Sequence, residues 1–254
     1  MGVVQGLTEF IPVSSSGHLV FFQSLFGLEG PQLFFDVMLH LGTLLAVILF
    51  FREDIRKIIV ETVETLKKRE RGREQTRLLL WILLATIPTG VMGILFKDWF
   101  ESLFSKPRTV GFMIMITGVV LWLTRRMKPP GRTLERMGWL DSILIGIAQG
   151  IAIIPGISRS GSTISAGLFC GLDRELCGKF SFLLSVPAIL GATLLELRKV
   201  NSVGELSPIL VGAAVAFVVG ILSLKFMMNI IKMGRVSNFS YYCWAVGILI
   251  VFLA

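Results

Sequence analysis

Long uncharged stretches alternate with short clusters of charged residues along this chain. Four of the stretches contain no Asp, Glu, Lys or Arg, and two more contain only a few polar residues. Runs of about 16–20 apolar residues cross, or nearly cross, a hydrocarbon core roughly 30 Å thick. We therefore predict six spanning helices, over residues 33–51, 78–96, 109–124, 180–197, 209–224 and 239–254.

Two polar segments interrupt the remaining apolar sequence, and the second repeats the first. One reads Gln-Gly at 5–6 and Ser-Ser-Ser-Gly at 14–17, and the other reads Gln-Gly at 149–150 and Ser-Arg-Ser-Gly at 158–161. These residues of the second copy lie 144 positions after their counterparts, and both copies end in Gly-Leu. Because Pro12 and the Ser-Gly run interrupt the first segment, we predict a re-entrant pair of half-helices there.

The basic residues are concentrated in two loops, residues 52–77 and 125–136. Such loops face the cytoplasm under the positive-inside rule. The two repeated segments then enter the membrane from opposite faces, which defines an inverted-topology repeat whose broken helices meet near the bilayer midplane. The predicted fold is one all-α polytopic membrane domain over residues 1–254, with repeat 1 at about 2–124 and repeat 2 at about 139–254.

Composition supports a membrane protein and excludes several other classes. The chain is 54% hydrophobic and 17% charged with a mean hydropathy of +0.77, whereas soluble domains are about 25% charged. The formal charge of +8 is explained by the juxtamembrane loops, so we do not expect nucleic-acid binding. The three cysteines have no metal-ligand spacing. Gln5 and Glu9 interrupt the first apolar stretch, which argues against a cleavable signal peptide.

The first polar turn offers Glu9, Ser15 and His18 as candidate reactive groups. If a half-helix begins near Ser14, Ser15 and His18 are three residues apart and share a face. An imidazole suits the task of removing a serine proton near neutral pH. Glu9 could orient that imidazole, bind a divalent ion or remain a buried acid. Ser14 and Ser16 are as well explained by close helix packing as by ligand binding.

The second polar turn places Arg159 between Ser158 and Ser160. A guanidinium in an apolar segment is expensive, so it should be paired or face a ligand. Its planar fork matches two phosphate oxygens, and the free N–H groups that open a helix attract anions as well. Together the two turns suit phosphoryl transfer, which depends on positioning and charge neutralisation. We interpret His40 and Ser185, which correspond across the repeat, as polar contacts between helices.

Two motifs in these turns resemble a known family. The run from Gln5 to His18, QGLTEFIPVSSSGH, and the run from Pro155 to Thr163, PGISRSGST, are similar to the signature motifs of the bacterial undecaprenyl-diphosphate phosphatases, the BacA or UppP family of bacitracin resistance. The stretch FSFLLSVP at 180–187 is similar to the family too, and the similarity extends along the whole chain. Position 5 departs from a common family form, because many members have Glu where this chain has Gln.

The resemblance implies a multi-pass enzyme of the bacterial cytoplasmic membrane that removes one phosphate from undecaprenyl diphosphate. That reaction recycles the lipid carrier for peptidoglycan, with the active site open to the periplasm or cell exterior. It implies a divalent cation, Mg²⁺ or Ca²⁺, for which Glu9 is the metal-ligand candidate. The catalytic set would be Ser15, His18, Glu9 and Arg159. The substrate-binding set would be Gln5, Ser14, Ser16, Gly17, Ser158, Ser160, Gly161 and Thr163.

Several alternatives stay open at the level of sequence. Our favoured scheme has Ser15 attack phosphorus with His18 as base, and His18 as nucleophile is a variant of it. A flippase or anion-coupled secondary transporter is the main rival, because inverted repeats are typical of transporters. The PAP2 lipid phosphatases have a similar Ser-Gly-His turn but need a second His downstream of Ser-Arg, which this chain lacks. The sequence also leaves open a homodimer and the position of the true N-terminus.

Overall fold

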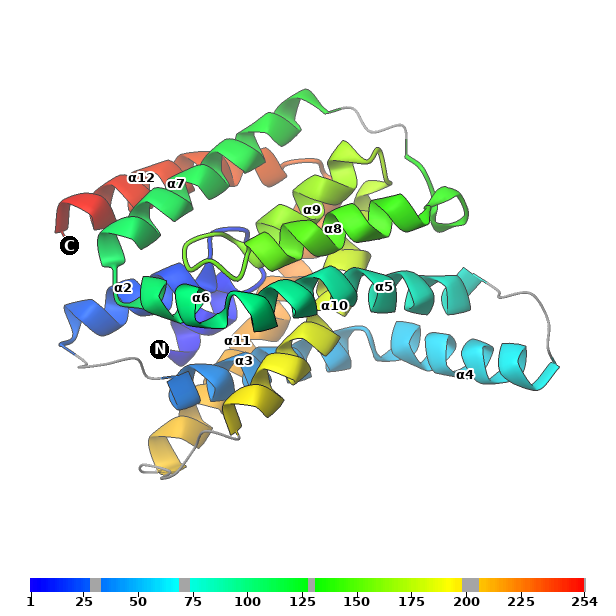
Figure 1. Ribbon diagram of the computed structural model, residues 1–254, viewed down its shortest axis with the longest axis horizontal. Helices are drawn as coiled ribbons and strands as arrows, with labels where there is room; N and C mark the ends of the chain where they lie inside the picture. Colours follow the sequence, from blue (N-terminus) through cyan, green and yellow to red (C-terminus); the bar gives the residue numbers. More distant parts are fainter. Residues whose placement is uncertain (28–32, 69–73, 128–130, 198–205, 254) are drawn as a thin grey trace.

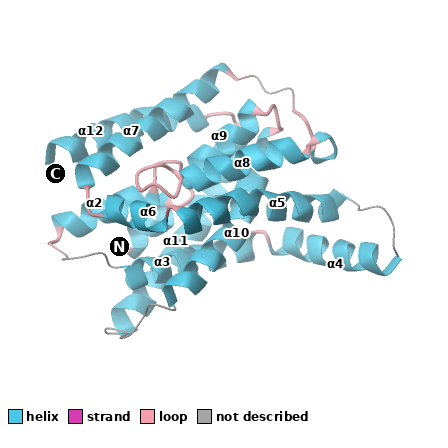
Figure 2. Ribbon diagram, in the orientation of Figure 1, coloured by secondary structure: helices cyan, strands magenta, loops and turns pink. Residues whose placement is uncertain are grey.

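The computed structural model describes residues 1–27, 33–68, 74–127, 131–197 and 206–253, and those residues form a bundle of helices without a strand (Figures 1 and 2). The α-helices are α1 (Gly2–Thr8), α2 (Ser15–Leu25), α3 (Leu33–Phe50), α4 (Arg52–Lys68), α5 (Glu74–Leu95), α6 (Lys97–Phe104), α7 (Pro107–Leu123), α8 (Trp139–Ile151), α9 (Arg159–Phe169), α10 (Arg174–Leu197), α11 (Leu206–Lys232) and α12 (Phe239–Leu253). Short 3₁₀ turns occupy Thr124–Arg126, Leu134–Arg136 and Val236–Asn238.

Five of the described helices are long and apolar enough to cross a membrane: α5, α7, α10, α11 and α12. A sixth span is obtained if α3 and α4, which meet at a bend of 70°, are counted together. Many large apolar side chains on these helices are exposed on the protein surface, for example Leu222 on α11, as expected where a helix faces lipid. The prediction of an all-α polytopic membrane protein is therefore confirmed, and each of the six predicted spans overlaps one helix.

The prediction of a loop over residues 52–77 was wrong for most of its length. Residues 52–68 form helix α4, which leaves the bundle at the bend after α3 (Figure 1). Clustered charges hid the helical period of α4. Ile58 and Thr65 are buried on one face, while the exposed faces carry charged residues together with apolar ones such as Leu66. The short helix α6 was not predicted either. Parts of both predicted basic loops, residues 69–73 and 128–130, and also Leu28, lie outside the described residues.

Small residues set the spacing between neighbouring helices. Helix α7 packs along α12, α3 along α11 and α5 along α8 (Figure 1). A Cβ added to Gly111 on α7 would lie 2.9 Å from the carbonyl oxygen of Gly247 on α12, so these two backbones touch. Close approach through glycine is the usual packing mode of membrane helices, which lack a hydrophobic driving force between them.

The two repeated segments form two matching pairs of short helices. Helices α1 and α2 are interrupted between Thr8 and Ser15, and α8 and α9 between Ile151 and Arg159. Helix α1 packs against α11, and α8 packs against α5. The half-helix that we placed near Ser14 begins at Ser15, the next residue. The opposite orientation of the two halves in the membrane and the repeat boundaries stay predictions.

Candidate functional site

The two interrupted turns contact each other directly. A Cβ added to Gly17 in the first turn would lie 3.2 Å from the Cα of Gly156 in the second. A Cβ added to Gly161 would lie 3.3 Å from the Cβ of Pro12. Since Gly161 and Gly156 lie 144 positions after Gly17 and Pro12, the same contact is made twice with the partners exchanged. The starts of α2 and α9 are thereby brought together inside the bundle.

Each turn is closed by the serine that precedes its second helix. The Ser14 hydroxyl accepts a hydrogen bond from the Gly17 N–H at 3.2 Å, and the Ser158 hydroxyl accepts one from the Gly161 N–H at 3.1 Å. In both turns the serine two residues later, Ser16 or Ser160, lies 3.3 Å from that hydroxyl. Ser14 and Ser158 therefore cap their helices, and Ser16 and Ser160 contact the capping hydroxyls, which accounts for these serines without excluding contact with an anion.

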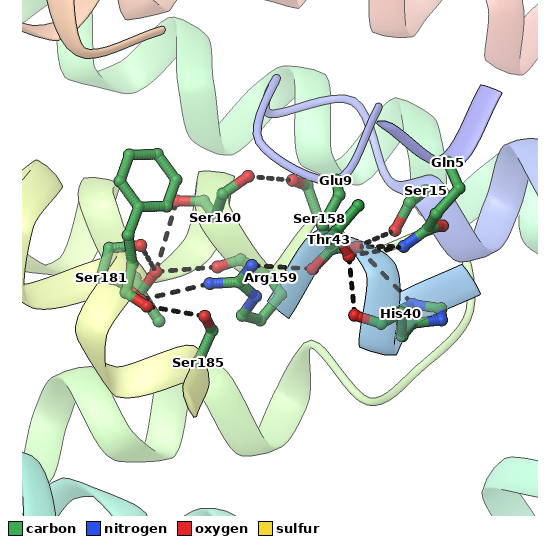
Figure 3. A network of polar contacts seen from close by, with 12 residues as sticks. Gln5, Glu9, Ser15, His40, Thr43, Ser158, Arg159, Ser160, Ser181 and Ser185 are labelled. Carbon is green, nitrogen blue, oxygen red and sulfur yellow. Dashed lines mark hydrogen bonds and ion pairs between the residues drawn. The ribbon is translucent and has the colours of Figure 1, made fainter. Parts of the chain in front are cut away.

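Glu9 lies where the two turns meet, and its carboxylate joins them (Figure 3). Its Oε1 accepts a hydrogen bond of 2.8 Å from an Nη atom of Arg159, and its Oε2 accepts one of 2.6 Å from the Ser15 hydroxyl. The Glu9 side chain is 6% exposed and the Arg159 side chain 16%. Breaking such a shielded ion pair from one side leaves an uncompensated charge. The structure thus brings together three of the four predicted catalytic residues.

Gln5 and His40 complete the surroundings of the Glu9 carboxylate (Figure 3). The Gln5 amide donates to Oε2 at 3.1 Å and to the Thr43 hydroxyl at 3.4 Å. The His40 Nε2 lies 3.5 Å from the same Oε2, while its Nδ1 is 2.7 Å from the backbone oxygen of Asp36. A carbonyl only accepts, so the Nδ1 of His40 bears a proton. The contact with Glu9 is an ion pair only when Nε2 is protonated as well.

The far side of Arg159 is held by helix α10. Its other terminal nitrogen donates to the backbone oxygen of Ser181 at 3.2 Å. The Thr163 hydroxyl is 2.6 Å from the Ser181 hydroxyl and also donates to the Arg159 carbonyl at 2.9 Å. Thr163, predicted as a substrate-binding residue, therefore contacts the backbone and α10 rather than the Glu9 carboxylate. Its position fixes the first turn of α9, from which Arg159 projects.

His18 is near the cluster in sequence but makes different contacts. Its Nδ1 lies 2.7 Å from the Ser14 carbonyl oxygen, and its Nε2 lies 2.9 Å from the hydroxyl of Tyr242 on α12. Because the carbonyl accepts, Nδ1 bears the proton, and a neutral His18 accepts from Tyr242 at Nε2. The rings of His18 and Tyr242 also stack at 5.7 Å between centroids. Among the contacts of the described residues, the Ser15 hydroxyl donates to Glu9 and has no hydrogen bond with His18.

Sequence reasoning missed three contributors to this region: Tyr242, Thr43 and Ser181. Tyr242 and Thr43 belong to no motif, whereas Ser181 lies in the family-like stretch at 180–187, and each of the three reaches the site from a separate helix. His40 was noticed only as a contact between helices, because its nearest chemical partner is 31 positions away in sequence. One signal in the sequence could have indicated that His40 lies near the site. His40 corresponds to Ser185 across the repeat, so each lies on the helix that follows its turn.

The divalent cation implied by the resemblance finds few protein ligands here. Within the part of the chain that the structure describes, no three His, Cys, Asp or Glu side chains lie close enough to hold a metal ion. Both Glu9 oxygens already accept hydrogen bonds, and a guanidinium 2.8 Å away repels a cation. Among the described residues the buried Gln5 Oε1 has no hydrogen-bond partner, but one amide oxygen beside an occupied carboxylate does not make a cation site.

Fold and site together define a multi-pass membrane protein with a buried acidic, basic and hydroxyl cluster at the junction of two broken helices. Residues 1–249 match the family model for the bacitracin resistance protein BacA. The chain therefore belongs to this family. The transporter alternative finds no support in the comparisons with known proteins.

Curated relatives named undecaprenyl-diphosphatase match this chain over nearly its whole length. The protein of Halothermothrix orenii is 45% identical over 100% of this chain and 96% of its own. The protein of Carboxydothermus hydrogenoformans is 47% identical over 100% of this chain and 95% of its own. The protein of Methanobrevibacter smithii is 42% identical over 98% of this chain and 94% of its own.

Proposed function

We propose that this chain is a membrane phosphatase that hydrolyses undecaprenyl diphosphate to undecaprenyl phosphate and inorganic phosphate. Membership of the BacA family and relatives named for this activity support the proposal. The observation on which it chiefly rests is the Glu9 carboxylate, which holds Ser15 from one turn and Arg159 from the other. A nucleophile, a proton acceptor and a phosphate-binding cation are then within reach of one headgroup.

In the proposed reaction, the Ser15 oxygen attacks the terminal phosphorus while its proton passes to Glu9. The hydrogen bond of 2.6 Å between them already points the proton at the carboxylate. The bond from phosphorus to the bridging oxygen breaks, and the lipid monophosphate leaves with that oxygen. Water then attacks the phosphoserine, and the bond from phosphorus to the Ser15 oxygen breaks. That oxygen takes back the proton held by Glu9, and inorganic phosphate leaves with both protons of the water.

Arg159 is suited to neutralise the charge on the transferring phosphoryl group. Its contact with the neutral Ser181 carbonyl can be exchanged for a phosphate oxygen at low cost, since an anion is the better acceptor. Its contact with Glu9 keeps the guanidinium oriented meanwhile. The N–H groups at the starts of α2 and α9 add partial positive charge at the same point.

We assign the two histidines different roles. His40 faces Glu9 and stabilises its charge when protonated, so it would act through Glu9 as a positioning residue. His18 donates from Nδ1 to the Ser14 carbonyl in the first turn and accepts at Nε2 from the Tyr242 hydroxyl. Two other hypotheses remain for experiment: His18 removes the Ser15 proton, or His18 is itself the nucleophile.

The lipid tail would remain in the bilayer of the bacterial cytoplasmic membrane while the diphosphate enters the cluster from the outer side. A divalent cation would have to take most of its oxygen ligands from the diphosphate, as Mg²⁺ often does in phosphate sites. No step of the proposed reaction depends on that cation. The orientation follows from the positions of the basic loops.

Two measurements on purified protein test this proposal. Release of inorganic phosphate from undecaprenyl diphosphate in detergent would support an enzyme, and lipid translocation in vesicles without hydrolysis would contradict it. Trapping the phosphorylated intermediate and mapping it by mass spectrometry would then identify the nucleophile. Phosphate on Ser15 is expected, and phosphate on His18 would overturn the assignment of the nucleophile.

A further inference from the structure

A polar cavity lies at the end of the bundle where α4 bends away from α3. Its volume is about 260 Å³, several times the space that one water molecule occupies in the liquid. None of the residues of the Glu9 cluster lines it. Its walls come from the junction of α3 and α4, the start of α10 and the last turns of α11: Phe50, Phe51, Asp54, Glu175, Lys179, Lys225, Met228, Asn229 and Lys232.

The charges around this cavity do not balance. Lys179 pairs with Asp54 at 2.5 Å and Lys232 pairs with Glu175 at 2.9 Å. Lys225 lines the same cavity and has no ion pair with any residue that the structure describes. Three ammonium groups therefore face two carboxylates, and one positive charge is left over.

The unbalanced positive charge belongs to a lysine within an apolar helix. Lys225 lies seven residues before the end of α11, about 10 Å along the helix at 1.5 Å per residue. The helix is otherwise apolar enough to span a membrane. Ionisable residues inside such helices are costly and usually face a partner or a polar cavity. Lys225 is exposed beside this polar cavity and has no ion pair with a described residue, so its ammonium group is available to bind an anion there.

The neighbouring surface indicates what kind of anion fits. Leu222 and Phe226, three residues before and one after Lys225, are 66% and 50% exposed. Phe50, Phe51 and Met228 give the cavity an apolar wall. A phosphate bearing a hydrocarbon chain would place its charge at Lys225 and lay its chain along these apolar side chains. We infer that this cavity is a second anion site, for the phosphate of an anionic membrane lipid, separate from the Glu9 cluster.

The test compares phosphatidylglycerol binding to the unaltered protein, Lys225→Gln and Lys57→Gln. Lys57 is an exposed lysine on α4 at the same end of the bundle and does not line the cavity, so it controls for nonspecific charge. Proteins in phosphatidylcholine nanodiscs with and without phosphatidylglycerol are analysed by native mass spectrometry. We expect Lys225→Gln to weaken retention of phosphatidylglycerol by roughly fivefold, the worth of one lysine near an anionic surface.

A second arm distinguishes the two sources of phosphate. Inorganic phosphate is titrated onto the protein in a neutral detergent while thermal unfolding is followed. No Lys225-dependent stabilisation supports a lipid headgroup, and Lys225-dependent stabilisation by phosphate alone would assign the site to a free anion. Equal losses of phosphatidylglycerol in Lys225→Gln and Lys57→Gln would overturn the proposal. Lys225→Arg, which keeps the charge, should retain the lipid and shows that loss in Lys225→Gln is not misfolding.

Discussion

The two turns at the centre of this molecule share a backbone plan and differ in chemistry. Ser15 and Arg159 occupy the same repeat position, each as the first residue of its helix, and both contact Glu9. The counterpart of Glu9 in the second turn is Ile153, and the counterpart of His18 is Ser162. The symmetric scaffold therefore presents two unlike side chains to a single carboxylate.

Gln5 and Gln149 occupy equivalent positions of the repeat but have different polar partners. Gln5 and Gln149 are both buried, and the Oε1 atom of each lacks a hydrogen-bond partner among the described residues. The Gln5 amide donates to Glu9, whereas the Gln149 amide donates only to Thr89, at 3.3 Å. The first half thus contributes Glu9 and Ser15, the proposed proton acceptor and nucleophile, and the second half contributes Arg159. Exchanging these residues between the halves should not be neutral.

The largest expected effect comes from removing the hydroxyl of Ser15, whose equivalent in the second turn is Arg159. Ser15→Ala should lower the rate of phosphate release by at least about a thousandfold, or roughly 4 kcal/mol of barrier, because no other hydroxyl donates to Glu9 Oε2 among the described residues. Steady-state phosphate release from undecaprenyl diphosphate measures this. Ser162→Ala, in the second turn, is the matched control and should stay within about threefold. Equal losses in both variants would contradict a unique nucleophile.

The second expected effect concerns the other equivalent position. Arg159→Gln should lower the turnover number about a hundredfold or more, as the loss of a preorganised charge stabiliser does. Arg159→Lys should recover only part of the activity, because an ammonium group cannot serve Glu9 and a phosphate with one planar fork. Thermal unfolding of both variants separates chemistry from folding, since an unpaired Glu9 also costs stability. Full activity in Arg159→Lys would exclude the proposal that one guanidinium must bind Glu9 and a phosphate oxygen together.

The third expected effect compares His40 with its counterpart Ser185. His40→Ala should lower phosphate release roughly tenfold, about 1.4 kcal/mol, because a charge-assisted contact with Glu9 is lost. His40→Gln should restore most of it, since an amide N–H can still donate to the carboxylate. Ser185 donates to the Phe182 carbonyl on its own helix, so Ser185→Ala should change the rate less than about threefold. Failure of His40→Gln to rescue would instead indicate proton transfer by His40.

Much of the fold follows from the sequence because lipid imposes simple rules. Spanning helices need long apolar runs, and all six predicted runs overlap helices in the structure. The rule that helices are long apolar runs misses α4, because this helix contains many charged residues. Its helical period, with Ile58 turned inward, becomes visible only when apolar positions are examined separately.

The candidate site was predictable only where its residues lie within motifs. Glu9, Ser15 and Arg159 were found from residue type and repeat position, and the structure places them in contact. The direction of His18 was not predictable, because it depends on Tyr242, 224 positions later on α12. Sharing a helix face made Ser15 and His18 plausible partners, but the Ser14 carbonyl holds the imidazole in another direction.

The last expected effect is on stability rather than on rate, and it tests the packing beneath the two turns. Gly6 and Gly150 are equivalent, but a Cβ at Gly6 would lie 2.9 Å from the Ala216 carbonyl oxygen and 2.8 Å from the Val219 Cβ. A Cβ at Gly150 would lie 2.4 Å from the Sδ atom of Met92, which is a flexible side chain that can move away.

Gly6→Ala should therefore lower the free energy of unfolding by about 1–3 kcal/mol, and Gly150→Ala by less than about 1 kcal/mol. Thermal unfolding in detergent gives the order of the two variants. A larger loss in Gly150→Ala would mean that the second turn is the more rigid one. The close backbone contact of α1 with α11 would then not be what holds the first turn in place.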